Sequence, residues 1–141
     1  MKFSLEQVGG LTIRAYDTGQ VTVVIPPWHP LRGVVNIAQD QEGNAEFTDS
    51  FIISREQLTC DWTPQTYDEL QPEHLTTLLA YEPELILLGT GAQLRFPNGE
   101  TMARIQQAGV GLEVMDTAAA CRTFNILVGE GRNVVAALMM I

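Results

Sequence analysis

The chain has 141 residues, of which 45% are apolar and 18% are charged, and its formal net charge is −9. This length and apolar content suit a single folded domain and argue against disorder. The excess of acidic residues argues against nucleic-acid binding and against docking on an anionic membrane, because both require clustered Lys and Arg. The acidity belongs to the first half: residues 1–83 carry twelve acids and four bases, and residues 84–141 carry five and four.

No segment has the roughly 20 consecutive apolar residues that a membrane-spanning helix needs. The first ten residues, MKFSLEQVGG, have neither the apolar core of a signal peptide nor the arginine-rich character of a transit peptide. Cys60 and Cys121 lie far apart without metal-ligand spacing, which is typical of free thiols in a reducing compartment. We therefore expect a cytoplasmic protein without a metal or another cofactor and without membrane insertion.

Residues 1–70 are predicted to be mainly β structure. Alternating residues 11–16 and the apolar run 21–28 predict a hairpin around a turn at residues 17–19, and three prolines then end the pairing. We expect a further strand over residues 33–38, a solvated loop over 39–46 (QDQEGNAE) and a short apolar strand over 50–54.

From residue 71 the apolar period changes, and we expect a leading helix followed by a βαβαβ unit. Pro72 and the leucines after it predict a helix that ends near Tyr81. The apolar run ELILLG (84–89), a helix over 100–108, a strand over 111–115, a helix over 118–128 and a last apolar strand follow in order. This order predicts an α/β single domain, in which a small parallel or mixed sheet packs with an N-terminal antiparallel β layer.

Ligands of parallel α/β sheets bind beyond the carboxyl ends of the strands, where helix N-termini point. Two segments occupy such positions: the GTG loop (residues 89–99, GTGAQLRFPNG) and the start of the helix after residue 115. The GTG loop has leucine where a dinucleotide-binding motif needs its third glycine, and tight exit from a strand explains its glycines equally well. Asp116 and Thr117 are predicted helix caps.

Three further polar residues stand out on the second helix. Arg122 and Asn125 lie opposite its apolar stripe, and Thr123 is next to them. Arg122 is either a solvated side chain paired with a carboxylate or a group that binds an anion or a partner's carboxylate. Glu130 and Arg132 are expected to form an ion pair in the turn before the last strand. No catalytic triad is visible in the sequence.

The segments ELILLGTGAQLRF and GVGLEVMDTAAACRTFNILVGEGRNVVAALM resemble a domain-of-unknown-function family. That family includes mitochondrial complex I assembly factor three, an adipogenesis-associated cytosolic vertebrate protein and many bacterial members. The resemblance covers nearly the whole chain and implies an α/β fold, no agreed enzymatic activity, and assembly through protein–protein contacts. It also implies a pocket beside the GTG loop, matching Thr90, Gly91, Asp116, Thr117, Arg122, Thr123 and Asn125 here.

We therefore expect a non-enzymatic, bacterial binding or assembly-factor-like protein with a protein partner. The alternative is a small-anion or metabolite-binding protein, or an enzyme, that uses a pocket at the GTG loop and the N-terminus of the 117–128 helix. The low charge density and aliphatic content are also compatible with a homodimer.

Overall fold

The structure is a computed structural model that describes residues 10–141. The expectation drawn from the first ten residues, that they hold no targeting signal, concerns residues 1–9 and lies outside the described part. Within residues 10–141, no helix is long and apolar enough to cross a membrane.

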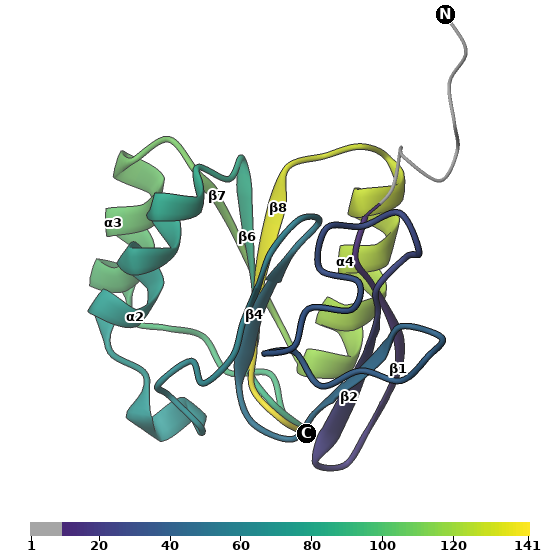
Figure 1. The fold of residues 1–141 in the computed structure, drawn as a ribbon. Helices are drawn as coiled ribbons and strands as arrows, with labels where there is room; N and C mark the ends of the chain where they lie inside the picture. Colours follow the sequence, from purple (N-terminus) through teal and green to yellow (C-terminus); the bar gives the residue numbers. More distant parts are fainter. Residues whose placement is uncertain (1–9) are drawn as a thin grey trace, which may run out of the picture.

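Two sheets and three main helices form an α/β architecture (Figure 1). An antiparallel sheet has the order β1-β2-β3, and a mixed sheet has the order β5-β4-β8-β6-β7. In the mixed sheet β6 pairs in parallel with β7 and β8, whereas β4 is antiparallel to β8 and β5. The strands are β1 (Thr12–Asp17), β2 (Gln20–Val24), β3 (Asn44–Phe47), β4 (Phe51–Ser54), β5 (Leu58–Thr59), β6 (Leu85–Gly89), β7 (Gly111–Met115) and β8 (Val134–Leu138).

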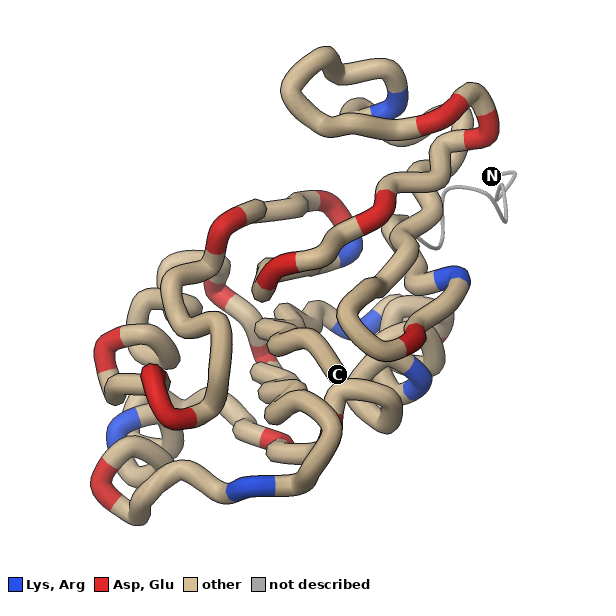
Figure 2. The backbone as a smooth tube through the Cα atoms, turned by 90° about the horizontal axis from the view of Figure 1, so that it is seen from below, with Lys and Arg blue, Asp and Glu red and all other residues tan. Residues whose placement is uncertain are grey.

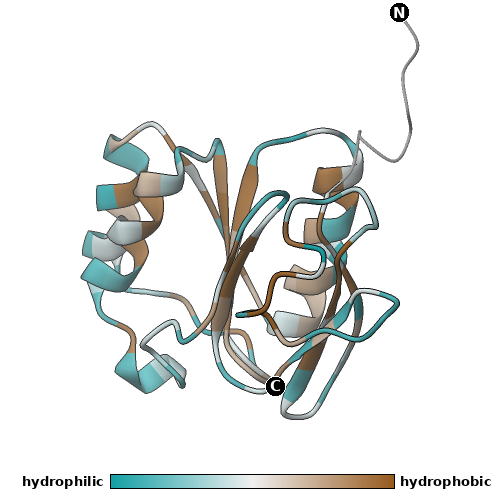
Figure 3. Ribbon diagram, viewed as in Figure 1, coloured by the Kyte–Doolittle hydropathy of each residue, from teal (hydrophilic) through white to brown (hydrophobic). Residues whose placement is uncertain are grey.

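The helices cover both faces of the mixed sheet. The short helices η1 (Tyr67–Glu69), α2 (Pro72–Thr76) and η2 (Thr77–Tyr81), with α3 (Gly99–Gln107), lie on one side, and α4 (Thr117–Gly129) lies on the other, between the two sheets (Figure 1). Brown, apolar segments line the interior between these layers (Figure 3). Two buried clusters result: one joins α4 to both sheets around Phe51 and Phe124, and the other packs α2 and α3 on the mixed sheet around Leu75 and Ile105.

The C-terminal half follows the predicted βαβαβ order. β8 is buried at all five residues, as expected for a central strand covered on both faces. Asp116 caps α4, and Gly109 and Gly131 have positive φ angles of 79° just beyond the ends of α3 and α4, which is where a left-handed residue ends a helix.

Two predictions for the first half are wrong. Residues 33–38 form successive turns instead of a strand. The reason is that hydrogen bonds close the loop between Ile25 and Gly43, which contains this segment. The Ile25 N–H donates to Gly43 O (2.8 Å), and the Arg32 guanidinium donates to Ile25 O (2.8 Å) and Gln41 O (2.6 Å). The solvated loop predicted over 39–46 ends early, because Asn44–Phe47 pairs with β2 as β3.

Candidate functional site

The carboxyl ends of the three parallel strands meet where the GTG loop leaves β6 and α4 begins. Gly89 is needed here because a Cβ atom would lie 2.9 Å from Thr117 Oγ1 and 3.2 Å from Thr117 Cα. Gly91 has a φ of +93°, which favours glycine. The strand end and the helix start therefore approach each other as closely as their backbones allow.

Thr117 and Asp116 join these two segments to each other. The buried Thr117 hydroxyl donates to Met139 O (2.7 Å) and accepts from the Gly91 N–H (2.8 Å), while the Thr117 N–H donates to Gly91 O (2.9 Å). Asp116 Oδ1 accepts from the Ala119 N–H (2.8 Å), as a helix cap does. These groups at the start of α4 are thus satisfied within the chain.

Thr90 organises the next turn of the GTG loop. Its side chain is buried, and its hydroxyl lies 2.6 Å from Gln93 O, to which it donates, and 3.3 Å from the Arg95 N–H, from which it accepts. The Thr90 N–H donates to Met115 O (3.0 Å) at the end of β7. These bonds close the GTG loop on itself and tie its start to the end of β7.

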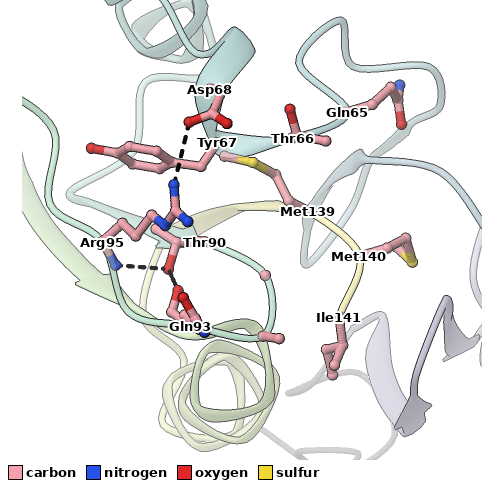
Figure 4. Close-up of a pocket in the computed structure, with 12 residues that line it drawn as sticks. Gln65, Thr66, Tyr67, Asp68, Thr90, Gln93, Arg95, Met139, Met140 and Ile141 are labelled. Carbon is pink, nitrogen blue, oxygen red and sulfur yellow. Dashed lines mark hydrogen bonds and ion pairs between the residues drawn. The ribbon is translucent and has the colours of Figure 1, made fainter.

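A pocket of about 380 Å³ opens beside the GTG loop, between the end of β8 and the segment around η1 (Figure 4). Arg95, Tyr67 and Asp68 lie together on one side of it: the Arg95 guanidinium is 3.3 Å from the Asp68 carboxylate and 5.6 Å from the centre of the Tyr67 ring (Figure 4). The Tyr67 hydroxyl also donates to Phe96 O. The lining residues are Gln65, Thr66, Tyr67, Asp68, Thr90, Gly91, Ala92, Gln93, Arg95, Met139, Met140 and Ile141.

Of the seven predicted site residues, Thr90 and Gly91 line this pocket. Asp116 and Thr117 hold the loops that form it, and the other three lie farther along α4. Arg122 donates to the Tyr16 hydroxyl (2.6 Å), with its guanidinium 5.9 Å from the Tyr16 ring centre. Asn125 bonds twice to Ile13: it accepts from the N–H (2.8 Å) and donates to the C=O (2.7 Å). Thr123, between them, is half-buried.

Sequence reasoning missed the pocket residues Tyr67 and Arg95. Arg95 follows a predicted strand end, which is a usable signal, but Tyr67 lies in a stretch rich in turn residues that predicts only a linker. The expected ion pair between Glu130 and Arg132 is also wrong, because Arg132 reaches Glu84 instead, with Nε 3.4 Å from Oε1.

Within residues 10–141, the thiols and other metal-ligating groups form no cluster. Cys60 is exposed and Cys121 is buried, and both are free. Burial raises the pKa of the Cys121 thiol to about 12, although the nearby Arg122 charge lowers it slightly, so this thiol stays protonated. Among the described residues, no three His, Cys, Asp or Glu side chains are placed to hold a metal ion together.

Residues 32–139 match the protein family described as "Protein of unknown function (DUF498/DUF598)". The chain belongs to this family. The match spans all five strands of the mixed sheet, including the β6–β8 region whose sequence resembles this family.

Several known proteins are similar to the chain, and two of these relatives are described first. A Francisella tularensis protein named "13 kDa major membrane protein" is 42% identical over 65 residues, covering 46% of this chain and 53% of that one. The zebrafish (Danio rerio) protein "NADH dehydrogenase [ubiquinone] 1 alpha subcomplex assembly factor 3" is 35% identical over 80 residues, covering 55% and 46%. The chain thus spans about half the length of these relatives.

A crystal structure of a Bordetella parapertussis protein has the same fold. Its TM-score is 0.73 at 29% sequence identity, and the likeness covers 93% of this chain and 96% of that one. The two chains therefore share nearly the whole of this α/β fold.

Proposed function

We propose that this chain is a non-enzymatic binding protein that acts through protein–protein contacts, as an assembly factor does. The observation that carries the proposal is the GTG loop, which presents large apolar side chains to solvent from a fixed backbone. Leu94 is 50% exposed and Phe96 is 61% exposed. Two contacts brace this part of the loop against the η1 segment. Arg95, between Leu94 and Phe96, forms an ion pair with Asp68, and the Tyr67 hydroxyl donates to Phe96 O.

A braced apolar loop suits protein recognition for a physical reason. Binding costs less when the contact residues are already ordered, and aromatic side chains dominate the energetics of many interfaces. The hydrogen bonds of Asp116, Thr117 and Asn125 within the chain also support this proposal, because these groups are then not available to a substrate. The zebrafish relative is itself named an assembly factor.

Affinity purification from the native host, with chemical cross-linking and quantitative mass spectrometry, tests the proposal. We expect a reproducible partner with the unchanged chain and its loss in the double variant Leu94→Ser, Phe96→Ser. Ile126→Ser is the matched control, because Ile126 is also 61% exposed but lies on α4. Recovery of no partner, or equal recovery with the double variant and the control, would contradict the proposal.

The alternative function is binding of a small anion or metabolite, or catalysis on one, in the pocket beside the GTG loop. The pocket of about 380 Å³ with Arg95 at its wall favours this alternative. Here Thr90 and Gly91 would contact the ligand, while Asp116 and Thr117 would hold the loop; Arg122, Thr123 and Asn125 would act only through α4.

A thermal-shift screen of nucleotides, acyl-CoAs and carboxylates tests the alternative. A ligand at 100 times its Kd should stabilise the chain by about 2.7 kcal/mol. Arg95→Ala should abolish the shift, and Arg122→Ala should leave it unchanged because Arg122 does not line the pocket. No shift with any of these compounds would reject this alternative.

We also propose that the chain works in the cytoplasm of a bacterium and does not bind nucleic acid. Free cysteines favour a reducing compartment, and 17 acidic against 8 basic residues disfavour contact with phosphates.

A further inference from the structure

Among the described residues, the mixed sheet has a free edge at β7. Within residues 10–141, β7 pairs with β6 alone. The Gly111 N–H donates to Glu84 O (3.1 Å), and Met115 O accepts from the Thr90 N–H (3.0 Å). Because successive residues of a strand turn their backbone groups to opposite sides, the N–H and C=O groups of Leu112 and Val114 point outward.

The edge strand β1 differs from β7, because a side chain of α4 bonds to its outward backbone groups. β1 is one of the two edge strands of the antiparallel sheet, and Asn125 satisfies both the N–H and the C=O of Ile13 there. No described residue does the same for Leu112 or Val114. An uncovered strand of five residues is a template for another strand.

The side chains of β7 specify what such a strand would look like. Leu112 and Val114 are half-buried at the border of the apolar cluster beneath α2 and α3, so an added strand with apolar side chains beside them would extend that cluster. Glu113 points the other way and is exposed. A basic side chain opposite Glu113 would complete a cross-strand ion pair.

We propose that β7 accepts an extended segment of a partner protein as a sixth strand of the mixed sheet, with a basic residue opposite Glu113 between two apolar residues. The inference rests on the proposed function, since it names the chemistry of the partner. Charge favours a different protein over a second copy. Antiparallel self-pairing centred on Glu113 would set two carboxylates opposite each other, and each copy has a net charge of −9. Acidic positions, drawn in red, are spread widely over the backbone (Figure 2).

An NMR titration of the full chain with synthetic peptides tests the backbone recognition directly. The probe is acetyl-Thr-Val-Lys-Val-Thr-amide, compared with the same peptide carrying Glu in place of Lys, and with a version N-methylated at both valines. We expect amide shifts centred on Leu112–Met115, about three- to fivefold weaker binding of the Glu peptide, and no shifts with the N-methylated peptide. Glu113→Lys should reverse the preference between the two charged peptides.

Absence of shifts at β7 with the Lys peptide, or equal binding of the N-methylated peptide, would overturn the inference. So would a concentration-dependent dimer in sedimentation velocity that Val114→Pro abolishes, because the edge would then belong to a second copy. Proline at position 114 removes an outward N–H and leaves the hydrogen bonds of Gly111 and Met115 to the β6 side in place.

The same variant separates failure of this inference from failure of the proposed function. In the affinity purification, Val114→Pro should lose the partner, as the double variant of Leu94 and Phe96 does. A partner lost in the double variant but retained by Val114→Pro would overturn the β7 inference and leave the proposed function intact.

Discussion

Asn125 shows how one side chain joins two elements that are more than 100 residues apart in the sequence. Its amide bonds to the N–H and the C=O of Ile13, as a neighbouring strand would. Ile13 lies where the register between β1 and β2 shifts, between Ile13 and Ala15. We predict that Asn125→Ala lowers the free energy of unfolding by about 1–3 kcal/mol, because it leaves a part-buried N–H and C=O without partners. Urea unfolding followed by circular dichroism measures the change.

Arg122, almost one helical turn before Asn125, provides the control. Its contact with Tyr16 is exposed, so Arg122→Ala should cost less than about 1 kcal/mol. A cost for Arg122→Ala equal to that for Asn125→Ala would show that the bonds to Ile13 do not stabilise the fold as argued.

The same two residues show what the sequence can predict about the site. Helical spacing places Arg122 and Asn125 away from the apolar stripe of α4, and this part of the prediction agrees with the structure. Their partners could not be predicted, because Tyr16 and Ile13 reach α4 only after the antiparallel sheet packs on it. The pocket also depends on long-range packing, since Tyr67, Arg95 and Met139 come from three separate segments.

Among the elements, the approach of α4 to β6 depends on the absence of a side chain at Gly89. A Cβ atom there would lie 2.9 Å from Leu138 Cδ2 as well as close to the backbone of Thr117. We predict that Gly89→Ala destabilises the fold by about 1–3 kcal/mol, because the start of α4 must shift. Chemical unfolding gives the energy, and hydrogen exchange at Gly91 and Thr117 should accelerate with it.

Gly99→Ala is the matched control, since nothing lies within 4 Å of a Cβ atom there and Gly99 begins α3. This substitution should be neutral or slightly stabilising. Unchanged stability of Gly89→Ala would contradict the argument, because it would mean that the start of α4 leaves room for a methyl group at position 89.

Elements with a strong apolar period were predictable, whereas those defined by side-chain bonds to backbone were not. β6, β7, α4 and β8 follow from runs and stripes of apolar residues with glycine at their ends. Residues 33–38 have the composition of a strand, but Arg32 and Gln39 hold this segment in turns through bonds to loop carbonyls. β3 could not be predicted from its own residues, NAEF, because they show no clear apolar pattern, and the strand forms by pairing with β2.

At the scale of the whole molecule, α4 is the element through which the two sheets stabilise each other. It contributes Ala120, Phe124 and Val128 to the buried cluster that also includes residues of β1, β2, β6 and β8. The end of the chain adds a second link, because Ile141 O accepts from the Gly19 N–H (3.0 Å) in the turn of the first hairpin. We infer that the sheets unfold together, as one cooperative unit.

Glu84 ties together the start of β6 and the start of β8, and it gives the molecule a defined response to acid. Its carboxylate accepts from the Asn133 N–H (2.9 Å) and from Arg132, and these bonds, the backbone one first, hold its pKa below the usual 4.5. A carboxyl group with a lowered pKa in the folded state stabilises the fold above its unfolded pKa, and this contribution is lost as pH falls through the folded value.

We therefore predict that Glu84→Gln is less stable than the unchanged chain at pH 7 and that the difference shrinks below pH 4.5. Urea unfolding of both chains at pH 7 and at pH 3 measures this difference. Comparing the two chains at each pH removes the general effect of acid on a molecule with a net charge of −9, which is shared by both. A difference that stays constant from pH 7 to pH 3 would show that the lost contact, and not the carboxylate charge, accounts for the effect.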